Sequence, residues 1–336
     1  IDEHSTLNDY LRQGLGNNPG VRASFYKWKA AHEKIAQEFS LEDPQFSYTD
    51  YSSESDKEEA FSVGQKLPWP GKLLIRKTKA EQESDEAYYD FQARRLEAVR
   101  AISEAYYEYA YLSKSILITQ ENIKLLKNFE SVIQVRYSSG LNKNQDLLKA
   151  QVELAKMEND LISMRDMQRP LAARLNSLLG FPESTVLPWP QETLEDASLE
   201  EAYADVDALI EEARKDNPEL LAAAKKVQAG AQELKLARRE YIPDLMVTVT
   251  QEKMKPSEMT SEDESWMVMF SVNVPLWFGR VNTAIREAKA EVKSLQAEEQ
   301  SKANEVDLMG SMAHYKLRDA IRQTRLYHDD LIPKAT

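Results

Sequence analysis

Residues 266–280 have the sequence WMVMFSVNVPLWFGR. Every second residue up to position 276 is strongly apolar: Trp266, Val268, Phe270, Val272, Val274 and Leu276. A period of two predicts a β-strand with one apolar face, and the run is about as long as the 9–11 residues of a transmembrane β-strand. We therefore expect the apolar positions to face lipid, while Ser271 and Asn273 face a water-filled lumen.

A second alternating run, 245–250, precedes the polar loop 255–265, so a β-hairpin is predicted over about 243–277. A matching hairpin is predicted over about 44–68, where Phe46 and Tyr48 alternate with polar residues and Phe61 and Val63 follow a polar loop. An ordinary soluble hairpin packed on helices is the alternative. Hairpins beside very long helices have little soluble core to pack on, which favours lipid.

Long helices fill most of the remaining sequence. Residues 72–139 contain neither Gly nor Pro, and helices are predicted over about 71–137, 144–179 and 279–333. The first would be roughly 100 Å long, which indicates helix-on-helix packing rather than a globular core. Its apolar residues form two lines: Val99, Ile102, Tyr106, Tyr109 and Ile116, and Leu112, Leu126 and Ile133. Two lines predict neighbours on both sides, as in a sheet or barrel of helices, although a solvent-exposed scaffold helix is an alternative.

The two halves of the chain repeat the same order of elements. Asn18-Pro19 precedes Pro44 by 26 residues, and Asn217-Pro218 precedes Pro243 by the same 26. The predicted domains are a first repeat at 1–180, a linker at 181–216 and a second repeat at 217–336. The fold class is mainly α with a small β part, built from a duplicated helix, β-hairpin, long helix and return helix. The second return helix is missing, so we expect the second repeat to be incomplete.

Composition argues against an enzyme and against nucleic acid as a partner. The net charge is −13, and the chain has no Cys and only four scattered His. Cysteine chemistry and a histidine-based metal site are therefore not expected. Met267 and Met269 are interpreted as space-filling residues, since methionine usually fills space. We expect no catalytic residue, cofactor or bound metal.

The chain resembles the TolC family of bacterial outer-membrane efflux channels. The resemblance rests on the duplicated unit, the Asn-Pro starts, the strand ending FSVNVPLWFG at 270–279, and the turn YSSGL at 137–141 followed by QDLL at 145–148. It covers essentially the whole chain, and the order and spacing of the motifs are specific. The sequence GQKLPWPGK at 64–72 is most similar to the branch associated with heavy-metal and cation efflux.

The resemblance implies a homotrimer in the outer membrane that extends into the periplasm. Each chain would give four strands to a twelve-stranded transmembrane β-barrel, and its helices would join an α-helical barrel. Such a channel passively conducts substrates that an inner-membrane pump delivers through a periplasmic adaptor. A periplasmic adaptor and a soluble coiled-coil scaffold are the alternatives, but 10 Gly argue against the former and the aromatic-edged hairpins against the latter.

The resemblance also implies roles for residues near the periplasmic tip. Gln145 and Asp146 match the periplasmic entrance, where an acidic residue takes part in links that hold the channel closed. Gly140 and Leu141 match the turn that contacts the adaptor. The alternative for Asp146 is structural, because an acidic residue in the first turn of a helix is favoured by the helix dipole alone.

Overall fold

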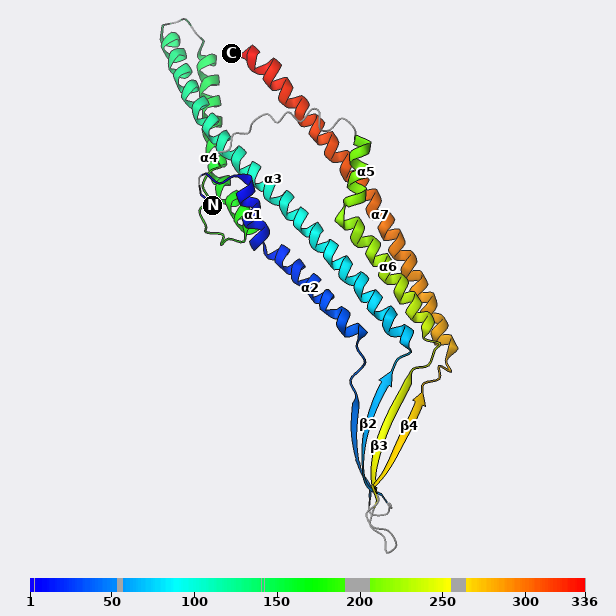
Figure 1. The fold of residues 1–336 in the computed structure, drawn as a ribbon. Coiled ribbons are helices and arrows are strands. Elements are labelled where there is room, and N and C mark those ends of the chain that lie inside the picture. Colours follow the sequence, from blue (N-terminus) through cyan, green and yellow to red (C-terminus); the bar gives the residue numbers. More distant parts are fainter. Residues whose placement is uncertain are drawn as a thin grey trace, which may run out of the picture. The chain divides into compact units, whose positions relative to one another are not determined.

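The computed structural model describes residues 1–2, 4–52, 57–139, 141, 143–190, 206–254 and 264–335. The prediction of a mainly helical chain with a small β part is confirmed. The elements in chain order are α1 (Leu7–Asn17), α2 (Pro19–Phe39), β1 (Gln45–Asp50), β2 (Lys57–Leu67), α3 (Pro70–Ser138), α4 (Asn144–Leu179), α5 (Val206–Asp216), α6 (Pro218–Arg239), β3 (Leu245–Met254), β4 (Glu264–Val272), α7 (Phe278–Arg325), the π-helical turn η1 (Leu326–Leu331) and α8 (Ile332–Ala335) (Figure 1).

The chain forms two compact units, which do not coincide with the two sequence repeats. Residues 1–25 and 91–199 make the first unit, and residues 26–90 and 200–336 make the second. The second unit combines segments of both repeats because their hairpins pair into one sheet. Helices α2 and α3 each contribute to both units, so each unit is described by itself.

The four strands of the second unit form one antiparallel sheet in the order β1-β2-β3-β4 (Figure 1). Strand β2 of the first repeat pairs with β3 of the second repeat. Leu67 is opposite Leu245 at one end of this ladder, and Lys57 is opposite Met254 at the other. A β-bulge between Lys57 and Glu59 interrupts this ladder near its far end. The sheet is therefore continuous across the duplication.

The helices of this unit follow the same order as the strands. Residues 26–39 of α2 lie beside α3, with Lys34 and Glu83 3.5 Å apart. Helix α3 also lies beside α6, where Lys79 Nζ is 2.8 Å from a carboxylate oxygen of Glu233. Helix α6 packs antiparallel to α7, as the ion pairs Lys226–Glu298 at 3.1 Å and Lys302–Glu219 at 2.8 Å show. Helix α3 therefore has neighbours on both sides within this unit.

A buried ion pair fixes the junction between strands and helices. The ammonium group of Lys72, in the first turn of α3, donates 2.8 Å hydrogen bonds to Asp244 Oδ1 and to the carbonyl of Ile242. The same Asp244 oxygen accepts a hydrogen bond from the Trp69 N–H at 3.2 Å. The Lys72 and Asp244 side chains are only 8% and 15% exposed. Since Asp244 precedes β3 and Trp69 follows β2, this group of contacts ties the two central strands together where they leave the sheet.

The Asn-Pro pairs that mark the sequence repeat begin helices α2 and α6. The Asn217 side chain accepts hydrogen bonds from the backbone N–H groups of Glu219 and Leu220, at 2.8 and 3.2 Å. The Asn18 side chain does the same at the start of α2, where it accepts from the N–H groups of Gly20 and Val21. Proline at the first helical position loses no hydrogen bond, and its fixed φ suits a helix. The motif therefore makes two sharp helix starts.

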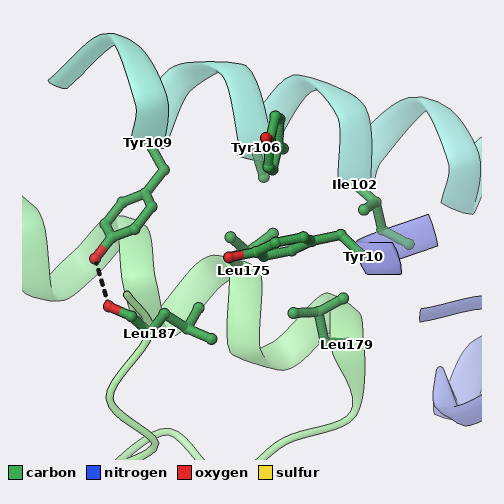
Figure 2. Close-up of a cluster of buried hydrophobic side chains, with 8 residues drawn as sticks. Tyr10, Ile102, Tyr106, Tyr109, Leu175, Leu179 and Leu187 are labelled. Carbon is green, nitrogen blue, oxygen red and sulfur yellow. Dashed lines mark hydrogen bonds between the residues drawn. The ribbon is translucent and has the colours of Figure 1, made fainter. Parts of the chain in front are cut away.

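The first unit has an ordinary apolar core, which Figure 2 shows. Ile102, Tyr106 and Tyr109 of α3 pack with Leu175 and Leu179 of α4. Tyr10 of α1 and Leu187 of the following segment complete the cluster, and the buried Tyr109 hydroxyl donates to the Leu187 carbonyl at 3.1 Å. A tyrosine can be buried at low cost here because its hydroxyl has a partner.

Within this unit α3 and α4 form an antiparallel pair that continues beyond the core. Lys127 Nζ lies 2.7 Å from a Glu158 carboxylate oxygen, and the Gln151 side chain donates to Glu130 at 2.9 Å. Helix α4 ends at Gly180, whose φ of 74° lies in the left-handed region. A side chain there would be strained, and its Cβ would come within 2.6 Å of the Asn17 carbonyl oxygen.

Within the described residues, none of the helices combines the length and the apolar character needed to cross a lipid bilayer.

Leu175→Ala tests the core of the first unit. The substitution should lower the free energy of unfolding by about 2–5 kcal/mol, because Leu175 is fully buried and its loss leaves a cavity. Val186→Ala is the control, since Val186 is 91% exposed and should change the unfolding midpoint little. Thermal unfolding followed by circular dichroism measures both. Equal midpoints for the two variants would contradict the assignment of this core.

Asp244→Asn tests the junction of the second unit. Burial acts to raise the pKa of the Asp244 carboxyl, but hydrogen bonds from Lys72 and the Trp69 N–H outweigh it and hold the pKa below its ordinary value. A carboxyl with a lowered pKa stabilises the folded state above its unfolded pKa, and this stabilisation is lost as the pH falls through the folded pKa. The variant should therefore unfold at a lower temperature than the wild type at pH 7, and the difference should shrink toward pH 3. A pH-independent difference would show that charge has no part in it.

Candidate functional site

The sheet has one face that is apolar over most of its length and charged at the end near the loops, where Asp50, Glu59, Lys253 and Glu264 align across the four strands. The registers place Phe46 of β1 opposite Val63 of β2, Val63 opposite Val249 of β3, and Val249 opposite Val268 of β4. A row of apolar residues thus crosses all four strands. The other uncharged members of this face lie at every second position along the same strands: Tyr48, Phe61, Gln65, Leu67, Leu245, Val247, Gln251, Trp266, Phe270 and Val272.

The opposite face is built mainly from hydroxyl and thioether side chains. The Ser62 and Thr250 hydroxyls form a hydrogen bond of 2.9 Å across β2 and β3. Lys57 Nζ lies 2.7 Å from a carboxylate oxygen of Glu252. These contacts pair polar groups with one another on the face itself, so the face is polar and internally hydrogen bonded.

The exposure of the two faces is the reverse of that in a soluble sheet. Phe46, Trp266 and Phe270 on the apolar face are 76%, 66% and 69% exposed. Thr250 and Glu252 on the polar face are each only 7% exposed. A sheet that meets water buries its apolar face, whereas a sheet in a membrane-spanning barrel turns that face outward to hydrocarbon.

Among the described strands, each of the two edge strands of this sheet has a hydrogen-bonded neighbour on one side only. β1 pairs with β2, and β4 pairs with β3, so each outer strand leaves one row of backbone N–H and C=O groups for another partner. Unpaired backbone groups cost several kcal/mol each in hydrocarbon. The exposed apolar face therefore suits a membrane only when copies of the chain close the sheet.

Strand β4 ends earlier than the alternation predicted. The strand stops at Val272, so Val274 and Leu276 lie in the segment before α7 rather than in the strand. The Asn273 side-chain oxygen accepts a hydrogen bond from the Asp244 N–H at 2.5 Å, and Pro275 has no N–H to donate to a ladder. Val274 and Leu276 are nevertheless 62% and 69% exposed, so they extend the exposed apolar surface beyond the strand.

The predicted tip residues lie in the first unit, at the end of the α3–α4 pair. Gln145 and Asp146 are exposed in the first turn of α4, and Leu141 is 72% exposed. Gly140 lies outside the described residues. The structure thus places Gln145 and Asp146 side by side at the start of α4, while part of the predicted turn lies outside the described residues.

Gln145 and Asp146 line a groove of about 860 Å³ between the ends of α3 and α4. Its apolar lining residues are Leu126, Phe129, Val132, Ile133, Leu148, Ala150 and Val152, and its charged ones besides Asp146 are Arg136, Lys149, Glu153 and Lys156. Within the described part of the chain, the Asp146 carboxylate forms no ion pair. It is an exposed carboxylate at the edge of a groove with a mixed apolar and charged lining.

Two features of functional interest were not found by sequence reasoning. The Lys72–Asp244 pair joins residues 172 positions apart, and neither residue stands out in its local sequence. The four methionines on the polar face of the sheet share that face only because of the strand alternation and register. The period-two pattern was the available signal, and it assigned Ser271 and Asn273 to the luminal face, but Met267 and Met269 were interpreted only as space-filling residues.

A family model described as "Outer membrane efflux protein" matches residues 10–181 and 209–331. The two matched stretches together span most of the chain. They include all four strands and every long helix. A comparison with curated protein sequences gave no significant match.

Solved structures share the fold at low sequence identity. The outer-membrane channel OprN matches with a TM-score of 0.75 and 18% identity over 95% of this chain and 75% of its own. VceC, an outer membrane protein of Vibrio cholerae, matches with a TM-score of 0.72 and 16% identity over 96% and 79% of the two chains. A membrane protein from Pseudomonas aeruginosa matches with a TM-score of 0.71 and 17% identity over 89% and 73%.

Proposed function

The chain belongs to the outer membrane efflux protein family, and from that membership we propose that three copies form one passive channel across the outer membrane. The observation that carries the proposal is the reversed exposure of the sheet, with Phe46, Trp266 and Phe270 exposed and Thr250 and Glu252 buried. The chain itself is an outer-membrane efflux channel protein. The proposal concerns how its copies assemble and which residues control passage.

Strand count supports a trimer. Each chain gives four strands, so two copies would close an eight-stranded barrel and three would close a twelve-stranded one. An interior of about eight strands is filled by side chains, whereas larger barrels leave a lumen. Three copies are therefore the smallest closed assembly expected to leave a continuous lumen, and β4 of one copy would pair with β1 of the next.

The proposed orientation places the apolar face toward lipid and the polar face toward the lumen. Val268, Phe270 and Val272 then contact hydrocarbon from β4, and Val274 and Leu276 do so from the segment that follows it. Ser271 and Asn273 face the lumen. Exposed tryptophans at both ends of this segment, Trp266 and Trp277, suit the two membrane–water interfaces.

The tip of the α3–α4 pair is proposed to be the periplasmic entrance. Asp146 and Gln145 would narrow the pore, and Gly140 and Leu141 would meet a periplasmic adaptor that receives substrate from an inner-membrane pump. The exposed Leu141 and the apolar groove beside Asp146 support a protein partner here. The channel uses no cofactor in this proposal. Assignment to the heavy-metal and cation branch stays a prediction.

Spin labels on two neighbouring residues test the orientation of the sheet. Residues 1–336 contain no Cys, so within them Phe270→Cys and Ser271→Cys each introduce a single labelling position. In the full-length protein in lipid, the label at 270 should collide more with oxygen and the label at 271 more with a water-soluble nickel complex. The opposite preferences follow because successive strand residues point to opposite faces.

The labelled protein should first be shown by sedimentation in detergent to have the mass of three subunits. Equal accessibility of the two labels in such a trimer would overturn the barrel assignment. A monomeric mass would overturn the trimer.

Asp146→Asn tests the entrance. A ring of three carboxylates attracts cations, and the attraction is screened by salt. The variant should show lower cation preference than the wild type, more so at low salt, and should open more readily because a charged acceptor is lost from the closed state. Single-channel recordings in planar bilayers give both quantities, as reversal potential under a salt gradient and as mean conductance.

Asp160→Asn is the matched control, because Asp160 is an exposed acidic residue farther along α4 and outside the groove lining. If Asp146→Asn matched the wild type, or if Asp160→Asn had the same effect, Asp146 would be a helix-start residue and no part of a gate.

A further inference from the structure

Positive charge is concentrated where helices α3 and α6 meet the sheet. The chain as a whole has a net charge of −13. Residues 70–80 of α3 nevertheless contain four basic residues and no acidic one, and residues 234–239 of α6 contain three basic residues and no acidic one. Both stretches lie next to the sheet, since α3 follows β2 and α6 precedes β3. The local charge is therefore opposite in sign to that of the whole chain.

Some of these basic side chains already have an acidic partner. Three form an ion pair: Lys72 with Asp244, Lys77 with Glu81 and Lys79 with Glu233. The other four, which we call the basic cluster, form no ion pair with any described residue: Arg76 of α3 and Lys235, Arg238 and Arg239 of α6. Arg76 is partly exposed and the other three are exposed, so the cluster is open to a partner from outside.

Contacts between α3 and α6 bring the basic cluster to one level of the helices. A Cβ at Gly71 would come within 3.0 Å of an Arg239 guanidinium nitrogen, so Arg239 lies over the first turn of α3. About two turns farther along α3, Lys79 is paired with Glu233 of α6. The helices run antiparallel between these two contacts, so Arg76 lies at the level of residues 235–239. The basic cluster is therefore confined to about two turns of two adjacent helices.

Helix preferences account for only part of the basic cluster. Cations in the last turn of a helix interact favourably with its dipole, and Arg238 and Arg239 lie in the last turn of α6. The same dipole favours acidic residues at the start of a helix, yet the first turn of α3 contains none. Arg76 lies in the second turn of α3, where the dipole does not favour a cation. What the two basic stretches share is their position beside the sheet.

A second copy of the chain does not supply the missing negative charge in the proposed barrel. The strand order places β2 and β3 in the middle of the sheet, so the joints between copies lie at β1 and β4. Helices α3 and α6 continue the middle strands, and α2 and α7 of the same chain lie beside them. The apolar face of the sheet, in contrast, runs up to Leu67 and Leu245, directly before α3 and after α6. The surface that continues into the basic cluster is the one proposed to contact lipid.

The position and the chemistry of the basic cluster suit phosphate groups at a membrane surface. Trp69 is exposed between β2 and α3, and tryptophan is favoured at membrane–water interfaces. Arg76 is roughly 10 Å along the chain from Trp69 at the helical rise. Long basic side chains reach back toward headgroups, whose negative potential extends about 8–10 Å. Three of the four cations are arginines, and the planar guanidinium group binds phosphate through two hydrogen bonds.

We propose that Arg76, Lys235, Arg238 and Arg239 bind the headgroups of anionic phospholipids in the periplasmic leaflet of the outer membrane. This inference rests on the proposed function, because the barrel places the sheet in a membrane and the helices on its periplasmic side. The bound lipid supplies the negative charge that the chain itself does not, and it holds the strand ends at the level of the headgroups.

Quenching of tryptophan fluorescence by brominated lipids tests the site. The full-length trimer is reconstituted in phosphatidylcholine vesicles, in which brominated phosphatidylglycerol or brominated phosphatidylcholine replaces an increasing fraction of the lipid. Because Trp69 is exposed beside the cluster, the wild type should bind phosphatidylglycerol at least about threefold more strongly than phosphatidylcholine. The variant Arg76→Gln/Arg238→Gln/Arg239→Gln should bind the two lipids almost equally.

Two further variants separate the basic cluster from net charge and from misfolding. Lys215→Gln/Lys316→Gln/Arg318→Gln is the matched control, because it removes the same charge from exposed positions of α5 and α7. These positions lie more than about 40 Å along α7 from the sheet, since α5 is paired with α7 through Arg214 and Asp307. The control should keep the wild-type lipid preference.

Arg76→Lys/Arg238→Lys/Arg239→Lys keeps the charge and should keep most of the preference. Sedimentation in detergent should give the mass of three subunits for every variant.

The two brominated lipids separate this inference from the channel proposal. Absence of any quenching by brominated phosphatidylcholine would overturn the membrane-spanning channel. Quenching by both lipids with equal affinity in the wild type would overturn the lipid site and leave the channel intact. The lipid site would also be overturned if the matched control lost the preference as fully as the glutamine variant, or if the trimeric lysine variant lost it.

Discussion

The edge strands of the sheet impose the constraint on which the rest of the structure depends. β1 and β4 each leave a row of backbone groups without a partner among the described strands, while the face beside them carries exposed Phe46 and Phe270. Water would satisfy those backbone groups but not the apolar face, and hydrocarbon would do the reverse. Both demands are met when other copies supply the missing strands, because a closed barrel has no edge. In the proposed barrel, assembly is then a condition for the fold of the sheet and not a later addition to it.

Closure also constrains the helices of the second unit. Each strand is joined to a helix, and strands β1 to β4 have the same order as α2, α3, α6 and α7. A layer of helices attached strand by strand to a curved sheet has to curve with it. This arrangement explains why α3 contacts α2 through Lys34–Glu83 and α6 through Lys79–Glu233. Such partly exposed ion pairs add little stability, but they fix the register of long helices that lack a thick core.

Much of this fold could be predicted from the sequence, because its main signals are local. The absence of Gly and Pro over 72–139 predicted α3, the alternation around Phe270 predicted β4, and the repeated Asn-Pro pairs marked two helix starts. The end of β4 at Val272 was not predicted, since the side chain of Asn273 replaces a ladder bond by contacting the distant Asp244. Pairing between residues far apart in the chain leaves no periodic signal.

The candidate site was predictable only in part for the same reason. The apolar face follows from period two, but the pairing of β2 with β3 across the two repeats decides which residues of the polar face lie together. The position of Asp146 in the first turn of α4 fits both a gate and a simple preference for the helix dipole, so its sequence context cannot decide between them. The groove beside it is built from α3 and α4 together and appears only in three dimensions.

One chain therefore obeys two opposite rules for apolar residues. In the first unit Tyr10, Tyr106 and Leu175 are almost fully buried, as in any protein that folds in water. In the sheet of the second unit Phe46, Trp266 and Phe270 are exposed, whereas Thr250 and Glu252 are buried. The exposed apolar surface of the sheet ends where the strands join the helices, and the exposed Trp69 and Trp277 lie at these ends. A tryptophan, with an apolar ring and a polar N–H, suits such a boundary, and the Lys72–Asp244 pair is buried there with its charged groups hydrogen bonded to each other. The Lys72–Asp244 pair lies at this boundary, where the first turn of α3 meets the start of β3, and from there it ties β2 to β3.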